Sequence, residues 1–218
     1  MGFGVKVNVW GDWACFTRPE MKVERVSYDV ITPSAARAVL EAIYWKPAIR
    51  WIIDRIHVLK PIRFSNIRRN EVDGKLAPSA IKRASEDGSA KLEVLIEERR
   101  QQRAAMVLRD VAYVIEAHFE AVTNDGVNKG KHLDQFNRRL EKGRCFYQPY
   151  LGTREFSAHF SPVEKIPVSA LKGEKDLGWM LYDMNFTDKN NIQPMFFKAN
   201  MVDGIINVPH PDSAEVHK

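Results

Sequence analysis

The sequence predicts an α+β fold in which strands and helices follow one another in a definite order. Runs rich in β-branched and aromatic residues, typical of strands, cover residues 49–59 and 106–121. Two stretches with apolar residues at helical spacing begin after Thr32 and Asn128. With one more strand before these elements and one after them, the order is β-α-β-β-α-β. This is the split-βαβ or ferredoxin-like arrangement that RNA-recognition (RRM-like) modules share.

The first strand and the first helix have clear local signals. Residues 5–16 alternate apolar and polar side chains, with a bulge expected at Gly11-Asp12. Thr32 is the expected N-cap of a helix whose first position is a proline, a residue that fits there at no cost in hydrogen bonds. Pro47 disfavours helical geometry at the residue before it, so we expect this helix to end around residues 44–46.

The middle of the chain is predicted as two strands separated by a long polar segment. The strands cover residues 49–59 and 106–121. Residues 71–103 are polar and are interrupted by glycine and proline, which predicts a mobile insertion with one short helix at residues 79–85. The run at 67–70 (IRRN) indicates an irregular or edge extension of the sheet.

The second helix contains the most informative stretch of the sequence. Asn128 is a suitable N-cap, and Gly143 suits the position just after the last helical turn. The first turn holds Lys129, Lys131 and His132, although the positive end of the helix dipole disfavours cations there. One interpretation is a phosphate-binding site formed by free N–H groups, the helix dipole, a lysine and a histidine. The alternative is an exposed, solvated corner with no function.

The chain is predicted to end in a small β-sheet. The last strand of the ferredoxin-like domain is expected at residues 154–163. Three short antiparallel strands then follow, with a hairpin turn at Asp203-Gly204; they cover residues 178–186, 195–202 and 205–208. We therefore expect a domain at residues 1–164 and a small appendage at 165–218, which ends in a frayed tail from His210 onward.

The charge distribution favours a polyanionic partner. The first 164 residues hold 27 Lys and Arg against 21 Asp and Glu, so the basic excess belongs to the larger domain. A basic surface of this kind suits a nucleic acid. The residues that we expect to bind RNA are Lys46, Arg68, Arg69, Arg138, Arg139 and Arg144.

Other classes of site and location have no support in the sequence. Cys15 and Cys145 are far apart, and CxxC, HExxH and clustered acids are missing, so we expect neither a metal nor a cofactor. No stretch approaches the ~18 apolar residues of a membrane span. The N-terminus lacks the pattern of a signal peptide. We expect a soluble, cytoplasmic protein without a membrane partner.

Three long stretches carry a family resemblance. They are ITPSAARAVLEAIYWKPAIRW (31–51), RDVAYVIEAHF (109–119) and NKGKHLDQFNRRLEKGRCFYQPYLGTREF (128–156). They resemble the subtype I-C (Dvulg) CRISPR-associated endoribonucleases, members of the RAMP superfamily. The resemblance covers nearly the full chain. The polar insertion at 71–103 is longer than in the shorter members of that family.

The resemblance implies a function and a set of site residues. Members of the family cut the CRISPR precursor transcript within each repeat, which forms a stem-loop, and stay bound to the 5′ handle of the mature guide RNA. The other subunits of the subtype I-C effector complex are the implied protein partners. The implied catalytic residues are Tyr44 in AIYWK and Lys131 with His132 in NKGKH. Their side-chain tips are expected to surround a space the size of one phosphate.

These residue types suit RNA cleavage without a metal. A ribose 2′-OH attacks the neighbouring phosphorus and leaves a 2′,3′-cyclic phosphate and a 5′-OH. His132 suits proton transfer because a free histidine has a pKa of ~6.5, and Lys131 suits stabilisation of the phosphorane charge. Tyr44, with a free pKa of ~10, suits orientation of the ribose or phosphate, or proton donation. The sequence leaves open whether His132 or Tyr44 is the base.

Two other functions remain compatible with the sequence. One is a guide-RNA 5′-handle-binding subunit without catalysis. The other is a metal-dependent DNA nuclease, whose ligands would have to converge from distant parts of the chain. Cleavage of repeat RNA in EDTA separates both from the endoribonuclease.

Overall fold

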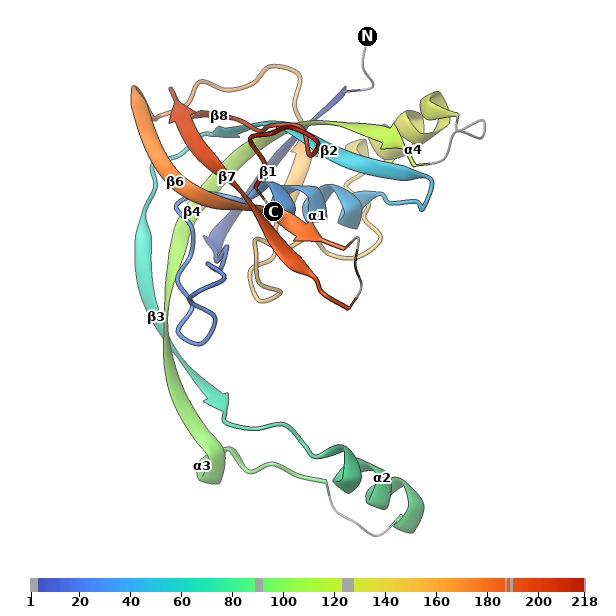
Figure 1. The fold of residues 1–218 in the computed structure, drawn as a ribbon, viewed down its shortest axis with the longest axis vertical. Helices are drawn as coiled ribbons and strands as arrows, with labels where there is room; N and C mark the ends of the chain where they lie inside the picture. Colours follow the sequence, from blue (N-terminus) through green and yellow to red (C-terminus); the bar gives the residue numbers. More distant parts are fainter. Residues whose placement is uncertain (1–3, 89–91, 123–127, 187, 189, 218) are drawn as a thin grey trace. The chain divides into compact units, whose positions relative to one another are not determined.

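The computed structural model describes residues 4–88, 92–122, 128–186, 188 and 190–217 (Figure 1). By the density of its contacts the chain forms two units. The first consists of residues 1–65 and 106–218, and the second of residues 66–105. Within the described residues, no helix has both the length and the apolar composition that a membrane crossing needs.

The first unit is built on one antiparallel sheet. Its strand order is β5-β1-β4-β2-β8-β7-β6, and neighbouring strands along this order run antiparallel. The strands of residues 165–218 continue this sheet because β8 pairs with β2. The strands are β1 (Gly4–Ala14), β2 (Ile49–Val58), β4 (Arg100–Ala121), β5 (His159–Pro162), β6 (Glu174–Asn185), β7 (Gln193–Val202) and β8 (Ile205–Asn207).

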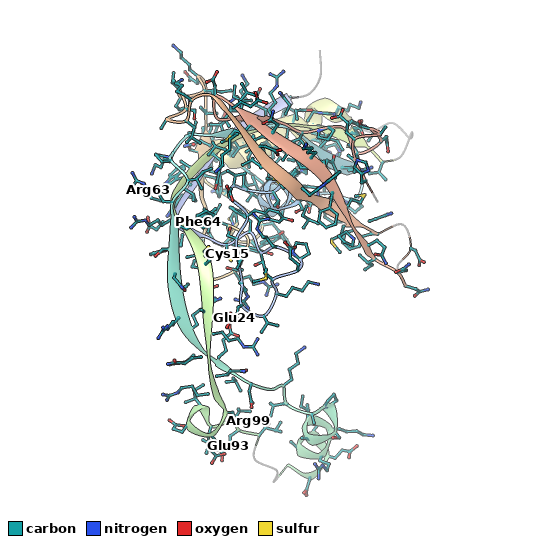
Figure 2. All side chains as sticks on the ribbon, turned by 60° about the vertical axis from the view of Figure 1, so that its left-hand side comes forward. Cys15, Glu24, Arg63, Phe64, Glu93 and Arg99 are labelled. Carbon is teal, nitrogen blue, oxygen red and sulfur yellow. The ribbon has the colours of Figure 1, made fainter. Side chains whose placement is uncertain are left out.

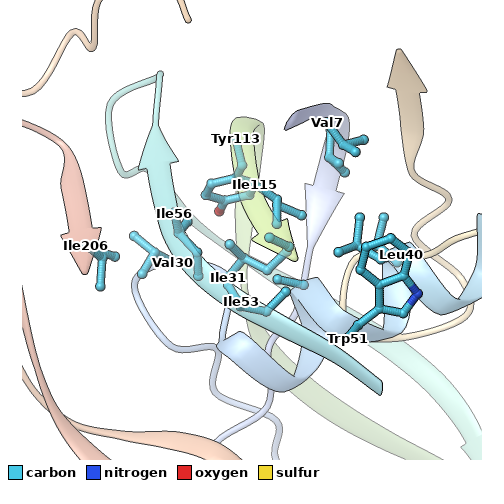
Figure 3. Packing of buried hydrophobic residues seen from close by; sticks show 14 of the residues in the cluster. Val7, Val30, Ile31, Leu40, Trp51, Ile53, Ile56, Tyr113, Ile115 and Ile206 are labelled. Atoms are coloured by element: carbon cyan, nitrogen blue, oxygen red, sulfur yellow. The ribbon is translucent and has the colours of Figure 1, made fainter. Parts of the chain in front are cut away.

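Helix α1 (Pro33–Ile43) packs against β2 and β6. Its N-terminus is the predicted one, since the Thr32 hydroxyl accepts a hydrogen bond from the Ala35 N–H at 3.3 Å. The buried side of the helix meets the sheet in a close-packed apolar core, in which Leu40 lies near Trp51 (Figure 3). The labelled strand residues of this core include Val7, Ile53, Ile56, Ile115 and Ile206.

Helix α4 (Lys129–Glu141) packs against β5 and α1. Asn128 is its N-cap, and Gly143, with φ of 60°, follows its last turn, so both predicted ends are confirmed. Phe136 and Leu140 are the buried residues of the helix. The opposite side, which carries the basic residues, remains accessible.

Two details of the predicted strands are wrong. The β1–β4 register is the same on both sides of Asp12, so the bulge expected at Gly11-Asp12 is not there. Only the pair of Asp12 with Asp110, whose φ is 53°, is missing from the ladder. Gly11 serves a different purpose, because a Cβ at this position would lie 2.6 Å from the Leu151 side chain. The fourth strand is also shorter than predicted: only His159–Pro162 pairs with β1, and residues 150 and 157 form an isolated bridge instead.

The predicted frayed tail is wrong as well. The His217 backbone exchanges two hydrogen bonds with Phe196 of β7, at 2.8 and 2.9 Å. Val216 beside it is 7% exposed and belongs to the core. Residues 210–217 are therefore held on the sheet by both pairing and burial.

The second unit contains β3 (Phe64–Val72, from Asn66 onward), the first residues of β4, α2 (Pro78–Asp87) and α3 (Ile96–Arg99). The run predicted as an irregular or edge extension of the sheet is strand β3, which pairs with β4. Residues 100–103, assigned to the insertion by sequence, are strand for the same reason. The short helix expected at residues 79–85 is present as α2. No residue of α2 or α3 is buried. Figure 2 labels the side chains of Arg99, in α3, and of Glu93, in the segment before it.

Candidate active site

Tyr44 is fixed at the end of α1. As the C-cap residue it leaves helical geometry, with φ of −155°, because Pro47 follows three residues later. Its N–H donates to the Leu40 carbonyl at 2.9 Å, and its own carbonyl accepts from the Trp51 indole N–H at 2.9 Å. The residue is 1% exposed. The backbone and the ring are therefore held in one place before any RNA binds.

His132 is positioned by the first turn of α4. The Asn128 side chain accepts from the Lys131 N–H at 3.0 Å, and the Asn128 carbonyl accepts from the His132 N–H at 3.3 Å. The helix is anchored by Phe136, whose ring lies 4.8 Å from the Trp51 ring. Capping and anchoring together place the imidazole edge to face with the Phe119 ring, at 6.2 Å between ring centroids.

The structure brings Tyr44 and His132 together from positions 88 residues apart. The Tyr44 hydroxyl oxygen lies 2.8 Å from His132 Nδ1, within hydrogen-bond distance. Either partner can donate, depending on the histidine tautomer. If Nδ1–H donates to the phenol oxygen, Nε2 carries the lone pair and can accept a proton. If the phenol donates to Nδ1, Nε2 carries the proton and can donate it.

The surroundings shift the pKa values of both groups away from neutrality. Burial lowers the pKa of His132, and the charges of Lys131 and Lys46 lower it further. Burial raises the pKa of the Tyr44 phenol, although the Arg139 guanidinium opposes this in part. At neutral pH the imidazole is therefore neutral, which favours its use as a base, and the phenol keeps its proton.

The cations around this pair have different environments. Lys131 and Lys46 are exposed, and both act electrostatically on His132. Arg139 is partly buried: its Nη1 donates to the Ile43 carbonyl at 2.8 Å, and its guanidinium lies 5.3 Å from the centre of the Tyr44 ring. Lys131 and Lys46 therefore suit a phosphate, whereas Arg139 also holds the end of α1.

The other predicted RNA-binding residues lie outside this contact. Arg138 and Arg144 are exposed in α4 and just after it. Arg68 and Arg69 lie on β3, in the second unit. Among the residues that the structure describes, no group of three or more His, Cys, Asp or Glu side chains could hold a metal ion.

Sequence reasoning missed the aromatic residues near the pair. Trp45 directly follows Tyr44, and Phe146 and Tyr147 follow α4; all three are exposed. They line one pocket together with Lys46 and Arg139. The sequence does contain a signal for them: Lys46 directly follows Trp45, and Arg144 lies two residues before Phe146. Aromatic and basic residues close together are typical of surfaces that bind single-stranded nucleic acid.

Comparisons with known proteins agree along nearly the whole chain. The family model described as CRISPR-associated protein (Cas_Cas5) matches residues 4–209. The chain is 53% identical over 223 residues to the CRISPR pre-crRNA endoribonuclease Cas5d of Mannheimia succiniciproducens, with 98% of each covered. It is 40% identical over 232 residues to the protein of that name from Thermus thermophilus, covering 98% of this chain and 95% of that protein. A crystal structure of a CRISPR-associated protein has a similar fold, with a TM-score of 0.69 over 99% of this chain and 96% of that chain, at 24% identity.

Proposed function

The chain belongs to the Cas5d family of CRISPR-associated proteins, and we propose that its site cleaves precursor RNA within the CRISPR repeats without a metal. The two curated relatives are pre-crRNA endoribonucleases, and the chain is an enzyme of this class. The observation that carries the proposed mechanism is the 2.8 Å contact between the Tyr44 hydroxyl and His132 Nδ1. Incubation with the cognate repeat RNA, followed by identification of the product ends, tests it.

We also propose that the fold is ferredoxin-like. The order β5-β1-β4-β2 supports this, because it is the spatial order that the split-βαβ arrangement gives to its fourth, first, third and second strands. In this arrangement, α1 connects β1 to β2 and α4 connects β4 to β5; the two strands of each connection run in the same direction with one antiparallel strand between them. Their ends bring Tyr44 and His132 to the same place.

In the proposed reaction, His132 is the base. Nε2 takes the proton of the ribose 2′-OH, the 2′ oxygen bonds to phosphorus, and the bond from phosphorus to the 5′ oxygen breaks. The 5′ oxygen takes a proton from a water molecule, and the hydroxide that remains takes the proton from His132 Nε2, which restores neutral imidazole. The products carry a 2′,3′-cyclic phosphate and a 5′-OH. Neutral imidazole is needed at the start, and the lowered pKa of His132 supplies it at neutral pH.

Tyr44 and Lys131 have supporting roles in this reaction. The buried Tyr44 hydroxyl accepts from Nδ1–H, which leaves the lone pair on Nε2 and stabilises the imidazolium after proton transfer. We thus assign Tyr44 the orientation of the imidazole rather than of the ribose or phosphate. Lys131 provides positive charge to the phosphorane oxygens, a contribution that depends on its position at the helix N-terminus.

After cleavage, the protein is proposed to stay on the 5′ handle of the guide RNA as a subunit of the antiviral effector complex. Exposed cations support continued binding because their attraction to phosphate does not depend on the chemistry; they are Lys46, Arg138 and Arg144. The second unit adds Arg68 and Arg69 as further candidate contacts to the repeat stem-loop.

The cleavage rate is expected to fall as the pH drops through the pKa of His132, because imidazolium cannot accept the 2′-OH proton. Since that pKa is lowered, the acidic limb of kcat/KM should lie below about pH 6.5. Lys46→Met removes one charge that lowers the pKa, so the limb should move to higher pH. Lys198→Met, at an exposed lysine of β7, is the control. An unmoved limb in Lys46→Met, or a rate that increases on acidification, contradicts the assignment of His132 as base.

The salt dependence of RNA affinity tests Arg138 as a phosphate contact. Arg138→Ala should reduce the slope of log affinity against log salt concentration by about 0.7, the value for one neutralised phosphate of a single strand. Because Arg138 is exposed on α4, its replacement should leave the fold intact, so a changed slope would report the lost charge. The exposed Lys165→Ala variant is the control. An unchanged slope would mean that Arg138 is an ordinary solvated residue.

A further inference from the structure

A pocket of about 410 Å³ adjoins the Tyr44–His132 pair. It is lined by Glu41, Trp45, Lys46, Arg139, Phe146 and Tyr147, among others. Two of these residues connect it to the pair: the Arg139 guanidinium lies over the Tyr44 ring, and the Lys46 charge lowers the pKa of His132. A ligand in the pocket would therefore be a direct neighbour of a phosphate at His132.

Two segments far apart in the sequence form the walls of the pocket. Trp45 and Lys46 follow α1, whereas Phe146 and Tyr147 follow α4. The Phe146 N–H donates to the Ala42 carbonyl at 2.8 Å, which holds the second segment against the end of the first. The pocket is thus built by the same two helix ends that build the Tyr44–His132 contact, and it is formed before a ligand binds.

The aromatic rings of the pocket are unusually accessible. Trp45 is 53% exposed, Phe146 80% and Tyr147 46%. The Phe146 and Tyr147 rings contact each other edge to face, at 6.1 Å between centroids. Such a group of exposed rings beside Lys46 and Arg139 suits a flat, aromatic ligand joined to a negative charge. A nucleotide of a single RNA strand has this chemistry: its base stacks on aromatic faces, and its phosphate meets the cations.

Glu41 adds a hydrogen-bond acceptor to this apolar and cationic lining. Its Oε1 accepts from Arg37 Nη1 at 2.6 Å, and Arg37 is in turn held by both oxygens of Asp183. This chain of ion pairs holds the Glu41 carboxylate in place at the pocket wall. A carboxylate accepts from the exocyclic amino group of adenine, cytosine or guanine, and uracil offers no such group.

We propose that this pocket binds one unstacked nucleobase next to the scissile phosphate, and that it prefers a base with an exocyclic amino group. The proposal rests on the proposed endoribonuclease site, because that site places the phosphate at His132. The pocket then acts as a specificity element: it holds the strand so that the adjoining 2′-OH faces Nε2. A double-stranded stem would not fit this use, since its bases are paired and stacked.

Affinity for an RNA that cannot be cut tests the pocket independently of catalysis. Three repeat RNAs carry 2′-deoxyribose at the cut. The first has all its bases, the second lacks the base on the 5′ side of the cut, and the third lacks the base on the 3′ side. Wild-type protein should bind one of the two abasic RNAs about 5- to 150-fold more weakly than the intact one. Trp45→Ala should bind the intact RNA as weakly as the wild type binds the abasic RNA. Removing the base should then reduce the affinity of this variant only slightly further. Replacing the same base by uracil should weaken binding by the wild type. The same replacement should have a smaller effect on binding by Glu41→Gln.

Matched variants separate stacking from loss of structure. Trp45→Phe keeps an aromatic face and should restore most of the affinity. Trp179→Ala, at a tryptophan of β6 that is 54% exposed, should bind all RNAs as the wild type does. The proposal is overturned if Trp45→Ala binds the intact RNA with wild-type affinity, or if the abasic penalty remains in full in this variant. If only the proposed catalysis fails, the wild type should leave the all-ribose RNA uncut. The affinity differences between the intact and abasic RNAs, and between the wild type and Trp45→Ala, should remain.

Discussion

Replacing His132 with alanine is expected to slow repeat-RNA cleavage by about 10²–10⁴-fold, the usual contribution of a positioned acid–base group. The imidazole contacts the Tyr44 hydroxyl and, because its pKa is lowered, is free to take a proton at neutral pH, whereas the raised pKa of Tyr44 keeps the phenol protonated. RNA affinity should change little, since His132 is one contact beside several exposed cations. Single-turnover cleavage and equilibrium binding of the same RNA measure both effects.

Two further variants make this result specific. His118→Ala is the control. Phe119 contacts His132, and neighbouring side chains of a strand point to opposite faces, so His118 lies on the other face of β4, where it pairs with Asp54. It should cleave at the wild-type rate. Lys131→Ala should weaken both binding and cleavage, because its charge acts on the phosphate before and during the reaction. Wild-type cleavage by His132→Ala would contradict the assigned base.

Local signals in the sequence were sufficient for most of the sheet and both main helices. Thr32 and Asn128 are recognisable as N-caps because capping involves residues within one turn. The strands at 49–59 and 106–121 were recognisable because both contribute to the core and are therefore rich in β-branched residues. The resulting α+β class with an antiparallel sheet agrees with the structure.

Elements that depend on long-range pairing were not predictable in the same way. Strand β3 has an exposed, arginine-rich sequence without a buried side, and only its pairing with β4 makes it a strand. The tail at 210–217 is ordered by backbone hydrogen bonds between His217 and Phe196, which its polar composition does not indicate. The composition of residues 154–158 predicts a strand, yet these residues form a loop that approaches β1 closely at Gly11.

The residues of the candidate site also differ in whether a local signal in the sequence reveals them. Lys131 and His132 stood out because cations at a helix N-terminus oppose the dipole. Tyr44 entered only through the family resemblance, because a tyrosine at a helix end is ordinarily a packing residue. Its contact with His132, 88 residues away in sequence, results from the packing of α4 on Trp51. The aromatic pocket likewise required the contact between Phe146 and Ala42.

A repeat RNA with a single 2′-deoxyribose just 5′ of the cut is expected to bind normally and to remain uncut. The nucleophile in the proposed reaction is the 2′-OH itself, so its removal leaves His132 with no proton to accept and phosphorus with no internal attacker. No other change to the substrate or protein should have a larger effect on the rate. Binding should persist because the phosphates and bases that the protein contacts are unchanged.

The most direct measurement combines this RNA with its all-ribose counterpart in the presence of EDTA. Wild-type protein should convert the ribose RNA into fragments with a 2′,3′-cyclic phosphate and a 5′-OH, and should leave the deoxy RNA whole. Cleavage of the deoxy RNA, or loss of cleavage in EDTA with 5′-phosphate ends formed only when metal is restored, would contradict 2′-OH attack assisted by His132.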